Sequence, residues 1–113
     1  MTENVLLGTD LKIKVELTCE GFSMDDNDFD LTLRWNGGEQ SYSKTSSSTD
    51  EHIVHAQDGS GWYLVIETEE LNMKNLVTLI ATLYVPDNDF PLKDGKRIRE
   101  EVVKQDLFNV KRP

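Results

Sequence analysis

A strict alternation of apolar and polar residues runs from Leu11 to Cys19, where every odd position is apolar and every even position is polar. Successive side chains of a β-strand point to opposite faces of a sheet, so this run predicts a strand with one dry face and one wet face. An α-helix would spread the same apolar residues around its circumference and leave no stripe to bury. The alternation recurs at Phe29, Leu31, Leu33 and Trp35, and again at Val77, Leu79, Ala81, Leu83 and Val85. The chain is therefore predicted to be an all-β protein with antiparallel sheets.

Glycine, asparagine and proline mark the turns between the expected strands. Asn36-Gly37-Gly38 is a strong hairpin signal, because Asn and Gly tolerate the positive φ of tight hairpin turns. The returning strand, Glu39–Lys44, is polar and is expected at a sheet edge. Further strands are expected at Val5–Leu7, His52–Ala56, Trp62–Ile66 and Leu76–Val85, with a turn or a single helical turn at Leu71–Asn75. Residues 1–113 would then form one two-sheet β-sandwich of about seven strands.

Two aromatic residues relate this sandwich to the immunoglobulin domain. Trp35 lies sixteen residues after Cys19, as in an immunoglobulin domain, and Tyr84 could stand in for the corner tyrosine of that fold. The second cysteine is absent, so the immunoglobulin-like assignment is an analogy of pattern. Trp35 and Trp62 are the largest candidates for the core, and aromatic residues at sandwich centres are more often core than ligand platforms.

The tail from Arg97 to Val110 fits two structures. Ile98, Val102, Val103, Leu107 and Val110 fit a helical stripe, and Glu100 with Lys104 is a favourable i,i+4 pair. A sandwich, however, commonly ends in a pairing strand. The pattern by itself favours a helix only slightly.

Charge and composition exclude several classes of function. Twelve basic residues against 21 acidic ones give a net charge of −9, which repels phosphate backbones and anionic lipid. Nucleic acid and membrane are therefore not expected as partners. Cys19 is the single cysteine, so no internal disulfide is expected. The first residues lack the basic start and apolar run of a secretory signal, and no stretch approaches the roughly 20 apolar residues of a membrane span, which predicts synthesis and folding in the cytoplasm.

The candidates for chemistry each have a simpler explanation. Asp26, Asp28 and Asp30 alternate at a spacing at which carboxylates can converge on Ca²⁺, but the glycine and the distant glutamate of an EF-hand loop are missing. His52 and His55 would point to opposite faces of a strand, which prevents joint metal ligation. We therefore predict no metal, no cofactor and no catalytic residue, and expect a protein that is not an enzyme.

Motifs in the second half of the chain resemble a known family. Gly61-Trp62-Tyr63-Leu64-Val65-Ile66-Glu67-Thr68 is followed by Leu83-Tyr84-Val85-Pro86-Asp87-Asn88-Asp89-Phe90-Pro91, and then by Asp94-Gly95 and Glu101-Val102-Val103. This order is similar to that of small prophage-encoded β-sandwich proteins, in particular the N-terminal domains of upper baseplate or tail-fibre proteins of phages. Leu92-Lys93 lengthens the turn relative to the family. The resemblance implies that the tail from Arg97 to Val110 is a strand, and we adopt that expectation over the helix.

The resemblance also implies a function. We expect a non-enzymatic structural or adaptor module of a phage-like tail or baseplate, which would contact other tail or baseplate subunits, could associate with itself and would be virion-associated. The alternative is a carbohydrate- or protein-binding β-sandwich of a host surface protein. The Ser41–Thr49 region, which carries Lys44 as its only gatekeeper charge, and the segment from Phe108 to Pro113 are the expected docking edges.

Overall fold

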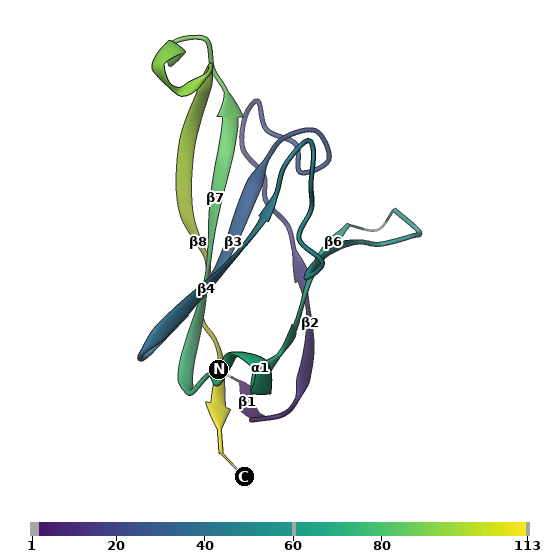
Figure 1. Cartoon of the computed structure of the whole chain (residues 1–113), viewed down its shortest axis with the longest axis vertical. Coiled ribbons are helices and arrows are strands. Elements are labelled where there is room, and N and C mark those ends of the chain that lie inside the picture. The colour runs from purple at the N-terminus through teal and green to yellow at the C-terminus, as the bar shows by residue number, and fades with distance from the viewer. Residues whose placement is uncertain (1–2, 60, 113) are drawn as a thin grey trace.

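The computed structural model describes residues 3–59 and 61–112 and consists almost entirely of β-strands in two sheets (Figure 1). The strands are β1 (Glu3–Leu6), β2 (Asp10–Val15), β3 (Phe29–Trp35), β4 (Gly38–Lys44), β5 (Ile53–His55), β6 (Trp62–Glu67), β7 (Asn75–Pro86) and β8 (Lys96–Lys111). A single helical turn, α1 (Thr68–Leu71), follows β6, and a short 3₁₀ turn, η1 (Pro91–Lys93), lies between β7 and β8. The prediction of an all-β, two-sheet fold is confirmed, with eight strands in the described residues.

The larger sheet has the strand order β1-β8-β7-β3-β4, and the smaller one has the order β2-β6-β5. All neighbours pair in antiparallel fashion except β1 and β8, which are parallel. The expectation of purely antiparallel sheets is therefore wrong at this edge. After β1 the chain turns at Gly8 and continues as β2 in the other sheet. The partner of β1 is therefore the distant strand β8, and no hairpin requires the two strands to be antiparallel.

The core lies between the two sheets and is built by the alternating residues. Phe29, Leu31 and Leu33 of β3 are fully buried. The inward residues of β7 are buried in the same way: Val77, Leu79, Ala81, Leu83 and Val85. Leu64 and Ile66 of β6 complete the layer from the smaller sheet. The period-2 pattern thus correctly predicts which side chains face the core.

One expected strand and the expected helical turn differ from the structure by three residues or more. The strand expected at Leu11–Cys19 ends at Val15, because its partner β6 begins at Trp62, which pairs with Val15. Beyond that point the chain leaves the sheet, although Leu17 stays buried, and Cys19 forms only an isolated bridge with Phe22. The helical turn comes earlier than expected, at Thr68–Leu71.

The tail is a strand, as the resemblance implied, and its helical pattern is misleading for a structural reason. The pairing of β8 with β7 shifts register twice, from Val77↔Phe108 to Leu79↔Lys104 and then to Ile80↔Val102. Asp106 has a positive φ of 50°, and its N–H bonds to Oγ1 of Thr78, so β8 bulges there. Extra residues in β8 reset the alternation between its two halves, which produces apolar spacings that resemble those of a helix.

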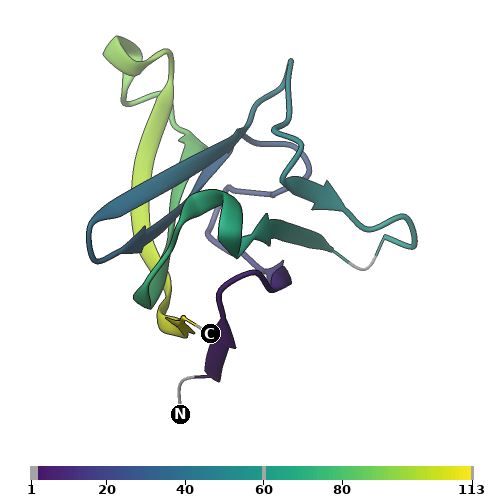
Figure 2. The same cartoon turned by 60° about the horizontal axis from the view of Figure 1, so that its bottom comes forward.

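The molecule is elongated, with extents of 50 × 32 × 25 Å, and its connections gather at two ends. The β7–β8 hairpin with η1 lies at one end of the long axis, and the two termini lie at the other (Figure 1). The β5–β6 hairpin instead projects sideways from the smaller sheet, as Figure 2 also shows. The two hairpins therefore offer surfaces that face in different directions.

Candidate functional site

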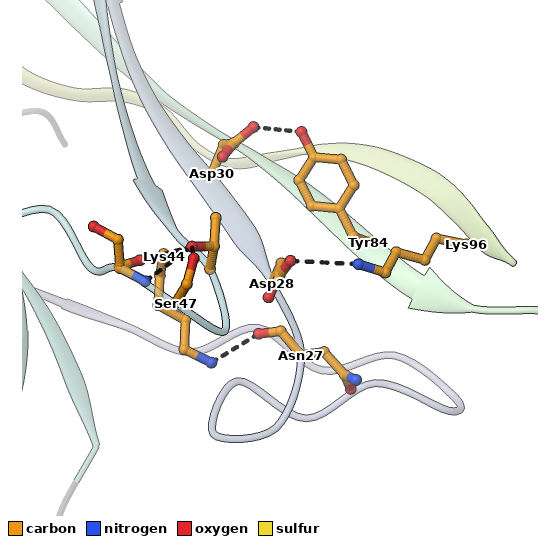
Figure 3. Close-up of polar contacts among 9 residues, drawn as sticks. Asn27, Asp28, Asp30, Lys44, Ser47, Tyr84 and Lys96 are labelled. Carbon is orange, nitrogen blue, oxygen red and sulfur yellow. Dashed lines mark hydrogen bonds and ion pairs between the residues drawn. The ribbon is translucent and has the colours of Figure 1, made fainter. Parts of the chain in front are cut away.

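The clearest polar constellation lies beside the β7–β8 hairpin, on the outer face of the larger sheet (Figure 3). A hollow of about 400 Å³ is lined there by residues from four strands and from the hairpin. They are Asp28, Asp30, Ser43, Thr45, Tyr84, Lys93, Asp94, Lys96 and Ile98. Adjacent strands β4, β3, β7 and β8 bring these residues together, although they lie as much as 70 positions apart.

Tyr84 and Asp30 form the tightest contact of this hollow. The Tyr84 hydroxyl donates a hydrogen bond of 2.6 Å to Oδ2 of Asp30. That bond, together with burial and the negative charges of neighbouring carboxylates, raises the pKa of Tyr84 to about 12. The phenol therefore stays protonated at neutral pH and acts as a hydrogen-bond donor. The hydroxyl bonds a carboxylate on the neighbouring strand, and not the backbone, which differs from the corner tyrosine to which Tyr84 was compared.

An ion pair lies among the residues that line the same hollow. Nζ of Lys96 lies 3.5 Å from Oδ2 of Asp28. The Asp28 side chain is mostly buried whereas the Lys96 side chain is about half exposed, so the pair is weakly held and its ammonium is accessible. Chemically, the hollow offers a half-buried aromatic ring, carboxylates, an ammonium group and the hydroxyls of Ser43 and Thr45.

Lys44 belongs to β4 but is turned away from this hollow, into the body of the protein. Its ammonium donates hydrogen bonds to the backbone carbonyls of Met24 (2.8 Å), Asp25 (3.2 Å) and Asn27 (2.9 Å). The side chain is only 7% exposed, and the same ammonium lies 5.6 Å from the ring centre of Trp62. A buried ammonium requires such partners, so Lys44 holds the β2–β3 loop in place.

The three alternating aspartates do not converge. Asp26 is exposed in the β2–β3 loop, whereas Asp28 contacts Lys96 and Asp30 accepts the Tyr84 hydrogen bond. Within residues 3–59 and 61–112, no group of three or more His, Cys, Asp or Glu side chains is placed to hold a metal ion.

The two histidines lie on or beside the edge strand β5, each with its own carboxylate and ring. Nδ1 of His52 lies 2.7 Å from Asp50, and its ring stacks on Tyr42. Burial alone would lower the pKa of His52, but the hydrogen bond to Asp50 and the surrounding carboxylates raise it. Nε2 of His55 lies 3.6 Å from Asp25. Neither pairing was predicted from the sequence. His52 and Asp50 lie in the same loop, whereas the contact of His55 with Asp25 joins two segments far apart in the chain.

The two tryptophans are only partly buried and pack against the core, so the expectation that they are its largest buried members is wrong. Trp62 is partly buried: its ring meets Phe29 edge-on, and its Nε1 donates a 2.8 Å bond to Asp25. Trp35 ends β3 beside the hairpin turn, where a Cβ on Gly38 would lie 3.1 Å from its ring. Both rings pack against the core from its ends, because each tryptophan occupies a terminal position of its strand.

Comparison with protein-family models, with curated proteins and with solved structures finds no match for this chain. Among the described residues, no helix has the length and apolar character needed to cross a membrane.

Proposed function

We propose that this protein is a non-enzymatic structural or adaptor module of a phage-like tail or baseplate, which acts through protein–protein contacts and is virion-associated. The observation that carries the proposal is the free edge of β4. This strand is the last of the larger sheet, and residues 38–42 have no pairing strand on their outer side among the described residues. An unpaired strand edge is a template for strand addition by another chain.

The end of β4 is covered by its own chain, which narrows the expected docking edge. The N–H of Asp50 donates to the carbonyl of Ser43, and Lys44 forms an isolated bridge with Thr49. Of the Ser41–Thr49 region expected from the sequence, only the part up to Tyr42 remains open. About five residues remain, close to the usual length of a strand.

Natural proteins protect strand edges with charge, proline or shortness, and β4 is the edge with the least protection. The one basic side chain of β4, Lys44, is turned inward, and Glu39 is engaged by Arg34 at 3.3 Å. The other edge strands differ: β2 presents Lys12 and Lys14 at exposed positions, β1 has only four residues and β5 has only three. This contrast supports β4 as the edge to which another protein adds a strand.

We also infer that the sandwich is immunoglobulin-like. In that fold strands B, E and D form one sheet, and strands C, F and G form the other, with C′ added in variable-type domains. The order β2-β6-β5 corresponds to B, E and D, and the order β8-β7-β3-β4 corresponds to G, F, C and C′. The connectivity supports the assignment, whereas the rim position of Trp35 and the lone Cys19 depart from antibody-type domains.

A binding experiment with charged edge variants tests the proposal. Each protein encoded by the genes adjacent to this one would be purified and titrated against the immobilised chain. At least one should bind, and Gln40→Lys with Ser41→Lys should weaken it at least about tenfold, since charge blocks strand addition. Thr18→Lys with Gln105→Lys adds the same charge at exposed positions elsewhere and should leave binding unchanged. The proposal would be contradicted if the chain bound none of these proteins, or if the edge variant and the control variant lost binding affinity to the same extent.

The Tyr84 hollow favours a second candidate, a saccharide-binding module of a host surface protein. A half-exposed aromatic ring beside carboxylates, an ammonium and hydroxyls suits the apolar faces and hydroxyl groups of a sugar. Calorimetry with oligosaccharide fragments of bacterial surface polysaccharides tests it. Tyr84→Ala should abolish binding, and Tyr63→Ala, on the other sheet, should not. Absence of any saccharide binding would eliminate this candidate.

A further inference from the structure

The open part of β4 presents its backbone groups in a fixed order. Along a strand, the N–H and the carbonyl of one residue point to one side, and those of the next residue point to the other side. The carbonyl of Ser43 points outward, because it accepts the N–H of Asp50, which lies outside the sheet edge. The backbone groups of Glu39 and Ser41 therefore point outward as well, whereas those of Gln40 face β3. Glu39 and Ser41 thus carry the donors and acceptors that another strand can meet.

The side chains of this segment leave the edge accessible. Glu39, Gln40 and Ser41 are all exposed. The turn of the β3–β4 hairpin projects from the body of the molecule, so the strand that follows it is open to approach (Figure 1). Nε2 of Gln40 donates to the Ser41 carbonyl at 3.1 Å, and that oxygen has a second lone pair for another donor. Pairing with another chain therefore does not require this contact to break.

The open segment is complementary to itself in the antiparallel direction. If two copies meet with Gln40 opposite Gln40, then Glu39 of each copy lies opposite Ser41 of the other. Residues that face each other with outward backbone groups exchange both N–H···O bonds, so the edge groups of Glu39 and Ser41 all acquire partners. The two Gln40 residues then form the non-hydrogen-bonded pair between them, in which side chains approach most closely.

The covered end of β4 sets one limit on the register. Residues 49–50 lie along the outside of the strand from Ser43 onward. A register centred on Ser41 would put Glu39 of the partner opposite Ser43, in the place that residues 49–50 occupy. A register centred on Gln40 ends before Ser43 and meets no such obstacle.

Charge sets the limit in the other direction. A register centred on Glu39 would place the two Glu39 carboxylates directly opposite each other, and like charges in that position are destabilising. The register centred on Gln40 places each Glu39 opposite the neutral Ser41 instead. Arg34 of the same copy also lies 3.3 Å from the Glu39 carboxylate. Steric fit and charge therefore select one two-fold register, and it uses all of residues 38–42.

We propose that two copies of this chain pair β4 with β4 in antiparallel fashion, with Gln40 on the two-fold axis. The inference rests on the proposed role of the β4 edge and names one occupant of it. The pairing joins two five-stranded sheets into one continuous sheet, and the assembly closes as a dimer because both copies use the same edge. The paired segment is short and each copy carries a net charge of −9, so we expect a dissociation constant on the order of 100 μM. At low micromolar concentration the chain is then almost entirely monomeric, and its edge stays open to other proteins.

Opposite charges at the two-fold axis test the register. At physiological ionic strength the wild-type chain should sediment as a monomer at about 10 μM and mainly as a dimer at about 1 mM. Gln40→Lys and Gln40→Glu should each weaken dimerisation at least about tenfold, because like charges then face each other. Mixed in equal amounts, the two variants should form a heterodimer with an affinity within about threefold of wild type. The Gln40 side chain is exposed, so circular dichroism and melting curves should match those of wild type.

Two pairs of variants serve as controls. Gln105→Lys and Gln105→Glu make the same changes at an exposed position of β8 and should dimerise like wild type, alone and mixed. Ser41→Pro and Ser41→Ala both remove the hydroxyl that bonds to Thr32. Ser41→Pro also removes an outward N–H that the ladder with β3 does not use, so it should abolish the dimer, whereas Ser41→Ala should keep it.

Three results would overturn the inference: a wild-type chain that stays monomeric at millimolar concentration, Gln40 variants that each dimerise like wild type, or a mixture without the heterodimer. A chain that is always monomeric but binds an adjacent-gene protein through β4 would contradict this inference alone. A dimer that forms while no adjacent-gene protein binds would contradict the proposed function alone.

Discussion

Replacing Lys44 with methionine is the sharpest test of how this fold holds the β2–β3 loop in place. Methionine keeps most of the length and apolar volume of the side chain but removes the ammonium. The carbonyls of Met24, Asp25 and Asn27 would then lose their donor. The loop that contains them leads directly into Asp28 and Asp30 of the polar hollow.

The magnitude follows from three hydrogen bonds, each with a net worth of about 1 kcal/mol, somewhat more with a charged donor. Removing a buried ammonium also removes its desolvation cost, which offsets part of the loss. We expect Lys44→Met to lower the free energy of unfolding by about 2 kcal/mol, which corresponds to a fall in Tm of roughly 8–14 °C.

Urea unfolding followed by tryptophan fluorescence measures this change, since Trp62 lies 5.6 Å from the ammonium. The midpoint should fall with an unchanged m-value, as expected for a change in stability alone. Lys104→Met, at an exposed position of β8, is the matched control and should stay within about 0.5 kcal/mol of wild type. A Lys44→Met protein as stable as wild type would refute the structural role of the buried ammonium.

Three further predictions concern other parts of the molecule. Because Asp28 and Asp30 contact Lys96 and Tyr84, millimolar Ca²⁺ should leave the Tm almost unchanged, and a gain of several degrees that Asp28→Ala abolishes would establish a calcium site. Trp62→Ala should cost about 3 kcal/mol of stability or insolubilise the chain, because it removes the ring against Phe29; a folded variant that loses a partner would instead make Trp62 a recognition platform. Since the pKa of His52 is raised in the folded state above its ordinary 6.5, its contribution to stability should be complete below pH 6.5 and lost as pH rises through the raised pKa; His52→Gln should remove this pH dependence in urea titrations, and an unchanged profile would contradict it.

The alternating pattern predicted the sheets well because it reports directly on which side chains face the core. Phe29–Trp35 has the expected bounds, and β4 lies at the expected edge. The tail was harder to predict, since the bulge at Asp106 depends on pairing with Thr78, far away in the chain. Its own residue pattern slightly favoured a helix, and the strand was expected from the family resemblance and from the usual end of a sandwich.

The polar hollow and the contacts of Lys44 were less predictable from the sequence, because both are made of contacts between distant segments. Tyr84 meets Asp30 only when β7 pairs with β3, and nothing local to either residue signals the bond. Lys44 appeared to be an exposed gatekeeper because lysines are seldom buried, yet three backbone carbonyls of the β2–β3 loop bind it. The exposed Leu92 was visible in the sequence only as a lengthened turn.

Hydrogen–deuterium exchange on the chain alone and in complex with an adjacent-gene protein tests the proposed function most directly. The edge amides of β4 should exchange readily in the free protein, because part of this strand has no outer partner. On binding, amides within residues 38–42 should become strongly protected, while those of the short edge strand β5 should not change. Protection confined to the Tyr84 hollow, with β4 unchanged, would contradict strand addition as the mode of contact.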